Sequence, residues 1–206
     1  VVSGGMDSVT LLYEKKDEIA LGISFDYGSN HNHNELPLAA LHCQRLGIEH
    51  VVVPLGFMHQ YFKSSLLESG DSIPDGSYDE ENMKSTVVPF RNGVMLAVAA
   101  GIAESNGLTK VLIANHGGDH TIYPDCRPEF IAAMDAAVEA GTFARVRVVA
   151  PYTNISKADI ARRGRALGID YAETWSCYKG GHVHCGTCGT CVERKEALRE
   201  AGIEDN

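Results

Sequence analysis

The first eight residues combine the glycines and polar side chains of an anion-binding turn, in the order Val-Val-Ser-Gly-Gly-Met-Asp-Ser. A short buried strand, a glycine turn and a helix start present backbone N–H groups and a positive helix end to phosphate. Gly4 and Gly5 allow a left-handed backbone and a close approach of an anion. Ser3 and Ser8 add hydroxyl donors. Asp7 could hold a metal ion, although Asp7 or Ser8 could instead simply cap the helix.

Four cysteines form a second candidate site near the other end of the sequence. They fall within fifteen positions, at Cys177, Cys185, Cys188 and Cys191. Four thiolates fit a closed tetrahedral zinc site, which has no open position for catalysis, so we interpret the site as structural. The alternatives are disulfides and an iron–sulfur cluster, because Cys-x2-Cys-x2-Cys also serves clusters.

Other cysteines and histidines are weaker candidates for metal binding. His182 and His184 lie inside the cysteine loop and could replace one ligand, but four cysteines already complete the shell. Cys43 and Cys126 have no partner at metal-ligand spacing. We expect a packing role for both.

Two cations outside the first motif could neutralise an anion. Arg91 could clamp a phosphate or a carboxylate, and Asn92 beside it could cap the helix that follows. Lys157 stands at the expected start of a helix, where its charge opposes the helix dipole. That conflict is resolved if an anion lies beside Lys157.

Residues 116–130 are expected to form a ligand-reading loop, because many polar, glycine and aromatic residues follow a strand there. His116 and His120 are not included as metal ligands, since no helix aligns them.

Alternating strands and helices are expected to position these groups. The strands are predicted over residues 19–25, 50–54, 110–115 and 146–150, and they read as buried parallel strands. The helices are predicted over residues 35–46, 93–105, 128–139, 157–167 and 192–201. This alternation predicts an α/β fold with a doubly wound, mainly parallel sheet, which binds ligands beyond the carboxyl ends of its strands. Residues 64–83 are expected to form a long loop, either a lid or a surface excursion.

Composition is that of a soluble, cytoplasmic protein. The 206 residues are 44% hydrophobic, and no stretch approaches the roughly 20 apolar residues of a membrane helix. No signal peptide is visible, although the chain opens with Val inside an expected strand, so we expect further residues before it. The net charge of −9 argues against a large non-specific nucleic-acid surface.

The chain resembles the 7-cyano-7-deazaguanine synthases of queuosine precursor biosynthesis, the QueC-type family of N-type ATP pyrophosphatases. The first motif resembles the pyrophosphate loop (PP-loop) of those enzymes. The resemblance spans nearly the whole chain, and the shared blocks are Ser3–Ser8, Phe25–Gly28, Val88–Asn92, Tyr123–Phe130, Lys157–Ile160, Thr174–Tyr178 and the clustered cysteines. The Tyr-Pro-Asp-Cys-Arg and Trp-Ser-Cys-Tyr blocks are the most specific.

Two segments depart from the family pattern. Ser29-Asn30-His31 stands where the family usually has Gln-Arg-His. His116–Ile122 replaces most of a segment of the form Ala-Val-Asp-Tyr-Ser-Gly, in which Asp119 still matches the family Asp. These departures bear on substrate contacts more than on the fold or the ATP chemistry.

The resemblance implies an adenine nucleotide alpha-hydrolase-like fold and a two-step reaction. In it, 7-carboxy-7-deazaguanine and ammonia become the nitrile through an adenylated acid and an adenylated amide. ATP, Mg²⁺ and one structural Zn²⁺ are the implied cofactors, and a homodimer is the implied assembly. We expect no membrane partner and no stable nucleic-acid complex. The expected division is an ATP-pyrophosphatase domain over residues 1–170 and a zinc-binding segment over residues 171–206 packed on it.

The resemblance also assigns roles to residues. The catalytic residues would be Asp7, Ser8, Arg91 and Lys157. The nucleotide would contact Ser3, Gly4, Gly5, Met6, Asp7, Ser8, Ile23 and Phe25. The deazaguanine substrate would contact Asp119, Tyr123, Asp125 and Arg127. Zinc would take Cys177, Cys185, Cys188 and Cys191.

Two other classes of function remain open. One is a different adenylating enzyme of the same type, either an amide ligase or a tRNA thiolase. A thiolase would need a catalytic cysteine pair and a basic RNA surface, and this acidic chain offers neither clearly. The other is a zinc-ribbon binding module, which would leave the Ser-Gly-Gly-x-Asp-Ser turn unexplained.

Overall fold

A computed structural model of the protein describes residues 1–68 and 70–205. The described chain forms two compact units. The main unit contains Val2–Pro89 and Lys157–Asn206, and the inserted unit contains Phe90–Ser156 together with Val1. The chain therefore leaves the main unit once and returns to it.

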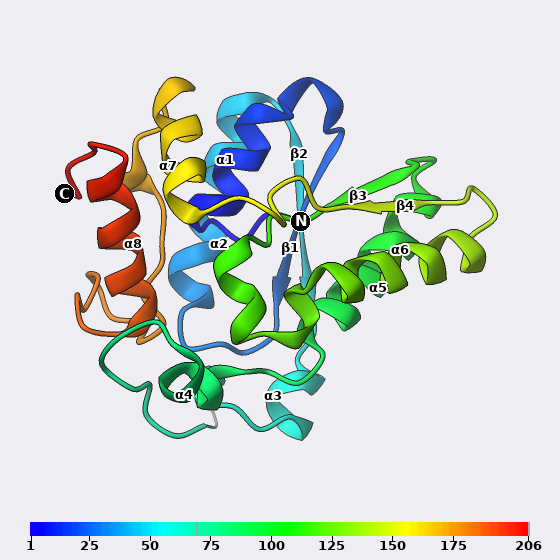
Figure 1. The fold of residues 1–206 in the computed structure, drawn as a ribbon. Coiled ribbons are helices and arrows are strands. Elements are labelled where there is room, and N and C mark those ends of the chain that lie inside the picture. The colour runs from blue at the N-terminus through cyan, green and yellow to red at the C-terminus, as the bar shows by residue number, and fades with distance from the viewer. Residues whose placement is uncertain (69, 206) are drawn as a thin grey trace. The chain divides into compact units, whose positions relative to one another are not determined.

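The main unit contains a pair of parallel strands joined by a helix (Figure 1). Strand β1 (Leu21–Asp26) pairs with β2 (Glu49–Pro54) in register, with Leu21 opposite Glu49. Helix α2 (Asn32–Leu46) makes the crossover that parallel strands require. Gly47 ends this helix in the left-handed conformation at φ 68°, as expected for a C-terminal glycine cap.

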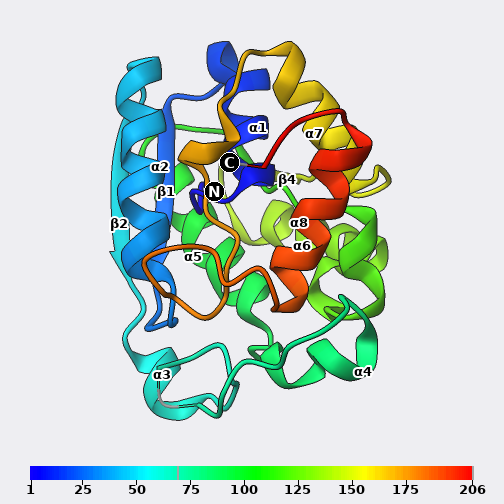
Figure 2. The ribbon, with the colours of Figure 1, turned by 90° about the vertical axis from the view of Figure 1, so that its left-hand side faces the viewer.

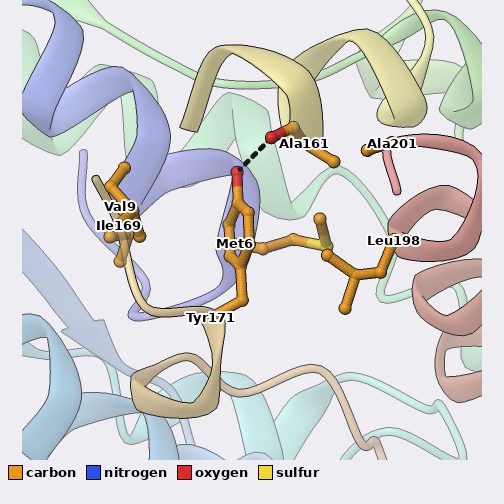
Figure 3. Packing of buried hydrophobic residues seen from close by; sticks show 7 residues of the cluster. All are labelled: Met6, Val9, Ala161, Ile169, Tyr171, Leu198 and Ala201. Atoms are coloured by element: carbon orange, nitrogen blue, oxygen red, sulfur yellow. Dashed lines mark hydrogen bonds between the residues drawn. The ribbon is translucent and has the colours of Figure 1, made fainter. Parts of the chain in front are cut away.

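Three further helices pack together in the main unit. Helix α1 (Met6–Glu14) contacts α7 (Lys157–Ala166), and α7 contacts α8 (Gly189–Glu200), as Figures 1 and 2 show. Buried side chains of these helices and of the residues that follow α7 and α8 meet in one cluster, drawn in Figure 3: Met6, Val9, Ala161, Ile169, Tyr171, Leu198 and Ala201. The short elements of this unit are η1 (Lys16–Glu18), α3 (Phe57–Tyr61), α4 (Glu80–Met83), η2 (Lys84–Thr86) and η5 (Tyr171–Glu173).

The inserted unit has the same strand–helix–strand logic. Strand β3 (Lys110–Leu112) pairs in parallel with β4 (Arg147–Val149), and α6 (Pro128–Gly141) connects them. Helix α5 (Arg91–Ser105) precedes β3 and contacts it. Two short 3-10 helices, η3 (Gly117–Thr121) and η4 (Pro124–Cys126), occupy the predicted ligand-reading loop. The α/β class and the parallel pairing of the strands are therefore confirmed.

The short strand expected at the start of the chain is not formed. Residues 1–5 lie in no strand. Val2 is nevertheless buried, and its N–H donates to the Ile23 carbonyl at 2.8 Å. Val1 and Val2 make too few ladder hydrogen bonds to extend a sheet. Their apolar character correctly predicts that Val2 is buried, but it does not predict the backbone conformation.

Residues 64–83 form a largely irregular segment, apart from α4 and outside Ser69, which is not described. Isolated bridges tie it at two points, from Ser29 to Leu67 and from Asp75 to Cys188. No helix among the described residues is long and apolar enough to cross a bilayer.

Candidate functional site

Hydrogen bonds within the predicted phosphate loop, residues 3–8, shape the turn at the start of α1. The Ser8 hydroxyl accepts the N–H of Ser3 at 3.1 Å and donates to the Gly5 carbonyl at 3.1 Å. The Ser3 hydroxyl lies 3.0 Å from the Ser8 hydroxyl and accepts the Gly5 N–H at 3.2 Å. These short-range bonds fix the turn, so the loop is shaped before any ligand arrives.

Gly4 is the residue of this loop with the strictest backbone requirement. Its φ is +90°, which L side chains rarely adopt. A Cβ on Gly4 would also lie 2.3 Å from the carbonyl oxygen of Glu35 on α2. The glycine turn therefore lets α2 approach the loop closely, a partner that the sequence did not indicate.

Met6, Ile23 and Phe25 are all buried, with at most 7% of their surfaces exposed. The Met6 side chain belongs to the hydrophobic cluster of α1, α7 and α8 (Figure 3). Any contact of Met6 with a nucleotide would therefore use its backbone.

Asp7 and Lys157 come together at adjoining helix starts. The Lys157 ammonium lies 3.2 Å from the Asp7 carboxylate and 2.9 Å from the Glu193 carboxylate of α8. The lysine at the start of α7 thus has its anions, and they are two carboxylates of the protein. Sequence spacing did not identify Glu193, because it lies 36 positions from Lys157.

A histidine and a glutamate at the start of α2 also lie close to the loop. His31 is 2% exposed, stacks on Tyr178 at a centroid distance of 5.2 Å, and places Nε2 3.5 Å from the Glu35 carboxylate. A Cβ on Gly5 would lie 3.8 Å from the same carboxylate. The spacing of four between His31 and Glu35 was the available signal, and only the fold shows that the pair lies near Gly5.

Asp125 caps a helix in the inserted unit. It is 7% exposed, and its Oδ2 accepts the backbone N–H of Asn92 at 2.8 Å, in the first turn of α5. The Asn92 side chain donates in turn to the Asp125 carbonyl at 3.1 Å. A carboxylate at a helix start is favourable. Helix α6 begins closer to Asp125 in the sequence, but the helix that Asp125 caps is α5.

The other predicted substrate residues also have partners in this unit. Asp119 accepts the backbone N–H of His116 at 3.2 Å, and the His116 ring accepts the Gly118 N–H at 3.1 Å. This reciprocal cap explains the histidine without a metal. Arg127 donates through Nε to the His120 carbonyl at 2.8 Å, and Tyr123 is 4% exposed. Arg91, half-buried, opens α5.

The four predicted metal ligands converge. Their sulfur atoms all lie within 4.8 Å of one another, and Cys177, Cys188 and Cys191 are buried. Tetrahedral zinc with Zn–S bonds of about 2.3 Å places its sulfurs about 3.8 Å apart. The sulfurs of Cys185 and Cys191 lie 3.9 Å apart, close to that spacing. The cluster therefore could hold a metal ion.

Backbone N–H groups point at the Cys185 sulfur and favour its thiolate form. The Cys185 sulfur accepts from the N–H groups of Thr187 at 3.4 Å and Cys188 at 3.3 Å. Burial alone would raise the pKa of the Cys185 thiol, but hydrogen bonds from Thr187 and Cys188 outweigh burial and lower it. His182 is exposed, whereas His184 stacks on Trp175 at 4.4 Å.

Similar proteins are known along the whole chain. Residues 1–202 match the family described as "Queuosine biosynthesis protein QueC". A Porphyromonas gingivalis (strain ATCC 33277) protein named 7-cyano-7-deazaguanine synthase is 69% identical over 205 residues, 100% of this chain and 93% of its own length. Proteins of the same name from Desulfotalea psychrophila and Rhizobium etli (strain CIAT 652) are 55% and 48% identical. These matches cover 97% and 100% of this chain, and 92% and 88% of the relatives.

One solved structure shares the fold at low sequence identity. It is the U34-tRNA thiolase NcsA from Methanococcus maripaludis with its 4Fe–4S cluster. The TM-score is 0.53 at 14% identity, with 99% of this chain and 72% of that chain covered. At this identity the likeness shows the fold alone.

Proposed function

The chain belongs to the QueC family of queuosine biosynthesis proteins, and we propose that it converts 7-carboxy-7-deazaguanine, ammonia and ATP into 7-cyano-7-deazaguanine. The observation that carries the proposal is the 69% identity, over the full chain, to a protein named for this product. The pre-shaped turn before α1, with its serine hydroxyls and helix start, is the chemistry that an ATP-cleaving enzyme of this kind needs.

The reaction proceeds through two adenylations. A carboxylate oxygen of the acid attacks the α-phosphate of ATP, and pyrophosphate leaves. Ammonia then attacks the carbonyl carbon of the adenylated acid. AMP and a proton leave, and the amide forms. The amide oxygen attacks the α-phosphate of a second ATP, and pyrophosphate leaves again. Loss of AMP and two protons from the adenylated amide then gives the nitrile. Each step needs positioned phosphates and stabilised charge, which account for much of the rate in phosphoryl and acyl transfer.

The main unit supplies the nucleotide-binding residues of this proposal. Ser3, Gly4, Gly5 and Ser8 receive the pyrophosphate of ATP at the start of α1, and β1 residues Ile23 and Phe25 flank the adenine. Met6 contributes its backbone N–H. Lys157 exchanges its carboxylate partners for phosphate.

Mg²⁺ fits beside Asp7, because one carboxylate together with phosphate oxygens is its usual environment in ATP-binding sites. Bound there, it would neutralise charge on the phosphates.

The inserted unit supplies the substrate-binding residues. Asp119, Tyr123 and Asp125 read the polar edge of the deazaguanine, and Arg127 binds its carboxylate through a guanidinium held by His120. Arg91 neutralises phosphate or carboxylate charge. These assignments follow the family resemblance of the Tyr-Pro-Asp-Cys-Arg block.

The metal of the four-cysteine centre is proposed to be structural zinc. Four thiolates with sulfurs within 4.8 Å suit a closed tetrahedral shell. We also propose a cytoplasmic homodimer, on the family resemblance.

A product assay tests the function. The protein is incubated with ATP, ammonium and 7-carboxy-7-deazaguanine, and nitrile, amide and AMP are measured by mass spectrometry. We expect the nitrile, with two AMP released for each. Asp7→Asn should abolish AMP release, while Asp17→Asn, an exposed residue of η1, should leave it unchanged. AMP release that needs a different acceptor, a tRNA or another carboxylate, would assign the chain to a different adenylating activity.

A further inference from the structure

The backbone around Trp175 contacts the phosphate loop directly. The Trp175 N–H donates to the Gly4 carbonyl at 3.0 Å. The Trp175 carbonyl oxygen lies 3.3 Å from the position that a Cβ on Gly5 would occupy. Both glycines of the loop are therefore in contact with one residue from the far end of the sequence.

The same segment also holds the first turns of α1. The Tyr171 hydroxyl lies 2.8 Å from the Thr10 hydroxyl, which donates to the Met6 carbonyl at 2.7 Å. Tyr171 is 2% exposed and lies in the cluster between α1 and α7 (Figure 3). Residues 171–177, which we call the connecting segment, thus fix the loop at its glycines and the helix behind it.

The other end of the connecting segment is part of the four-cysteine centre. It finishes at Cys177, whose carbonyl accepts the Trp175 indole N–H at 2.7 Å. The Trp175 ring stacks on His184 at 4.4 Å and 26°. The His184 ring accepts the Ser176 N–H at 3.1 Å, and His184 directly precedes the ligand Cys185. Trp175 therefore contacts the glycine turn on one side and the metal-binding loop on the other.

A buried arginine on α8 anchors the connecting segment. Arg194 is 1% exposed and donates to the Thr174 hydroxyl at 2.8 Å and the Tyr171 carbonyl at 2.7 Å. Its Nε donates to Asp205 at 2.9 Å, which pairs the buried charge. Arg194 follows Cys191 by three positions on α8, so the anchor starts from the metal centre as well.

We propose that the connecting segment couples the four-cysteine centre to the phosphate loop, with Trp175 as the positioning residue. Metal binding draws Cys177 and the 185–191 loop into one arrangement, which holds His184 against Trp175 and the Trp175 backbone against Gly4 and Gly5. Without the metal the sulfurs have no common partner, and the contacts of Trp175 with Gly4 and Gly5 no longer reinforce the hydrogen bonds within the turn when ATP binds. This inference rests on the proposed function, because it takes the loop to be the ATP site.

Binding of the α,β-methylene analogue of ATP tests the coupling without turnover. The metal-loaded protein and protein depleted by a chelator are titrated calorimetrically, after circular dichroism has shown that both are folded. Coupling between sites typically changes affinity by about 5- to 150-fold, so depletion should weaken analogue binding within that range. Trp175 is the single tryptophan of the chain, so its fluorescence should respond both to the analogue and to metal removal.

Two histidine variants keep the test decisive if depletion unfolds the protein. His184→Ala removes the ring that stacks on Trp175 and leaves all four cysteines, so it should retain its metal by elemental analysis and bind the analogue about fivefold or more weakly. His182→Ala, in the same loop but exposed, should behave as wild type.

The outcomes distinguish a failure of the coupling from a failure of the proposed function. Equal affinity for the analogue in metal-loaded wild type and metal-loaded His184→Ala overturns the coupling and leaves the proposed function standing. A metal-loaded wild type that does not bind the analogue removes the ATP site and the coupling together.

Discussion

Asp125 and Arg127 each have a partner within the inserted unit, so their removal has two kinds of consequence. Asp125 accepts the N–H of Asn92 at the start of α5, and Arg127 donates to the His120 carbonyl. Loss of a cap of this kind costs about 1 kcal/mol of stability. A stability change in an alanine variant therefore says nothing by itself about substrate binding.

Substitutions at these two residues should nevertheless separate substrate binding from ATP binding. Asp125→Asn keeps an oxygen for the Asn92 N–H but loses the charge that would pair with a guanine-like edge. Arg127→Ala removes the guanidinium that would bind the substrate carboxylate. Leaving a buried polar partner unsatisfied costs about 1–3 kcal/mol, so each variant should bind 7-carboxy-7-deazaguanine about tenfold or more weakly. Affinity for ATP should change little, because the phosphate loop is untouched.

Calorimetric titration of each variant with both ligands measures this separation. Glu129→Gln, an exposed neighbour in the same block, is the control and should bind both ligands as wild type. If Asp125→Asn and Arg127→Ala lose stability but keep their affinity for the deazaguanine acid, both residues serve only the fold.

Local sequence was enough to identify groups whose partners are close in the chain. The serine and glycine pattern of the phosphate loop corresponds to bonds within five positions, and the four cysteines lie within fifteen. The same reasoning could not find Glu193 beside Lys157, or Glu35 beside Gly4. Those neighbours are set by helix packing between distant segments, which no motif spacing encodes.

At the scale of elements, hydrophobic periodicity located the main helices and strands, and their ends were less well predicted. Helix α2 begins at Asn32 and not at residue 35, because polar residues continue the helix beyond its apolar stripe. Strand β3 ends at Leu112 although apolar residues continue to Ala114. A strand ends where its pairing with the neighbouring strand ends, and the apolar run alone does not show where the pairing with β4 stops.

Gly164 illustrates a packing requirement within one helix. A Cβ at this position of α7 would lie 1.9 Å from the Tyr171 hydroxyl oxygen and 3.0 Å from the Thr10 hydroxyl. Burial raises the pKa of Tyr171 to about 12, although the hydrogen bond with Thr10 opposes the rise, so the phenol stays protonated and bonded. We expect Gly164→Ala to lower the free energy of unfolding by about 1–3 kcal/mol, as overpacking does.

Gly101→Ala is the matched control for this prediction. Gly101 lies in the interior of α5, and apart from its chain neighbours and the backbone of its own helix, no atom of the described residues lies within 4 Å of the position that a Cβ would take. Alanine should therefore stabilise that helix by about 0.5–1 kcal/mol. Denaturant unfolding of both variants measures the contrast. A Gly164→Ala protein as stable as wild type would mean that Tyr171 can move aside at no cost.

At the scale of the whole molecule, strand pairing groups the chain in a way that local pattern does not reveal. The sequence alternates strands and helices with no linker-like break near residues 89 or 156. Pairing of β1 with β2 and of β3 with β4 nevertheless accompanies a division at those points. The C-terminal segment lies in the unit that begins at Val2, because Tyr171 and Trp175 bond to residues of the phosphate loop and α1.

The stability of the main unit should depend on pH through a buried histidine. His42 of α2 is fully buried, its Nε2–H donates to the Glu173 carbonyl at 2.9 Å, and its Nδ1 accepts from the Tyr13 hydroxyl at 3.1 Å. Burial lowers the pKa of His42 below its ordinary 6.5, and the positive charge of Arg45 adds to this, although the Glu173 carbonyl opposes it. Between pH 6.5 and the lower folded pKa, His42 is therefore protonated in the unfolded chain and neutral in the folded chain.

The sign of the effect follows from that difference in proton binding. As pH falls below about 6.5, the unfolded histidine protonates first, so the free energy of unfolding decreases until pH reaches the folded pKa. Above 6.5 His42 adds no slope. His42→Gln has no proton to bind, so its unfolding free energy should fall less steeply than that of wild type between pH 6.5 and 5. Acid also releases metal from cysteines, but it does so equally in both proteins, so the difference between their slopes isolates His42.

His33→Gln, exposed on the same helix, should follow the wild-type curve in denaturant unfolding at each pH. Identical slopes for His42→Gln and wild type would show that the buried ring accepts a proton in the folded state as readily as in the unfolded chain.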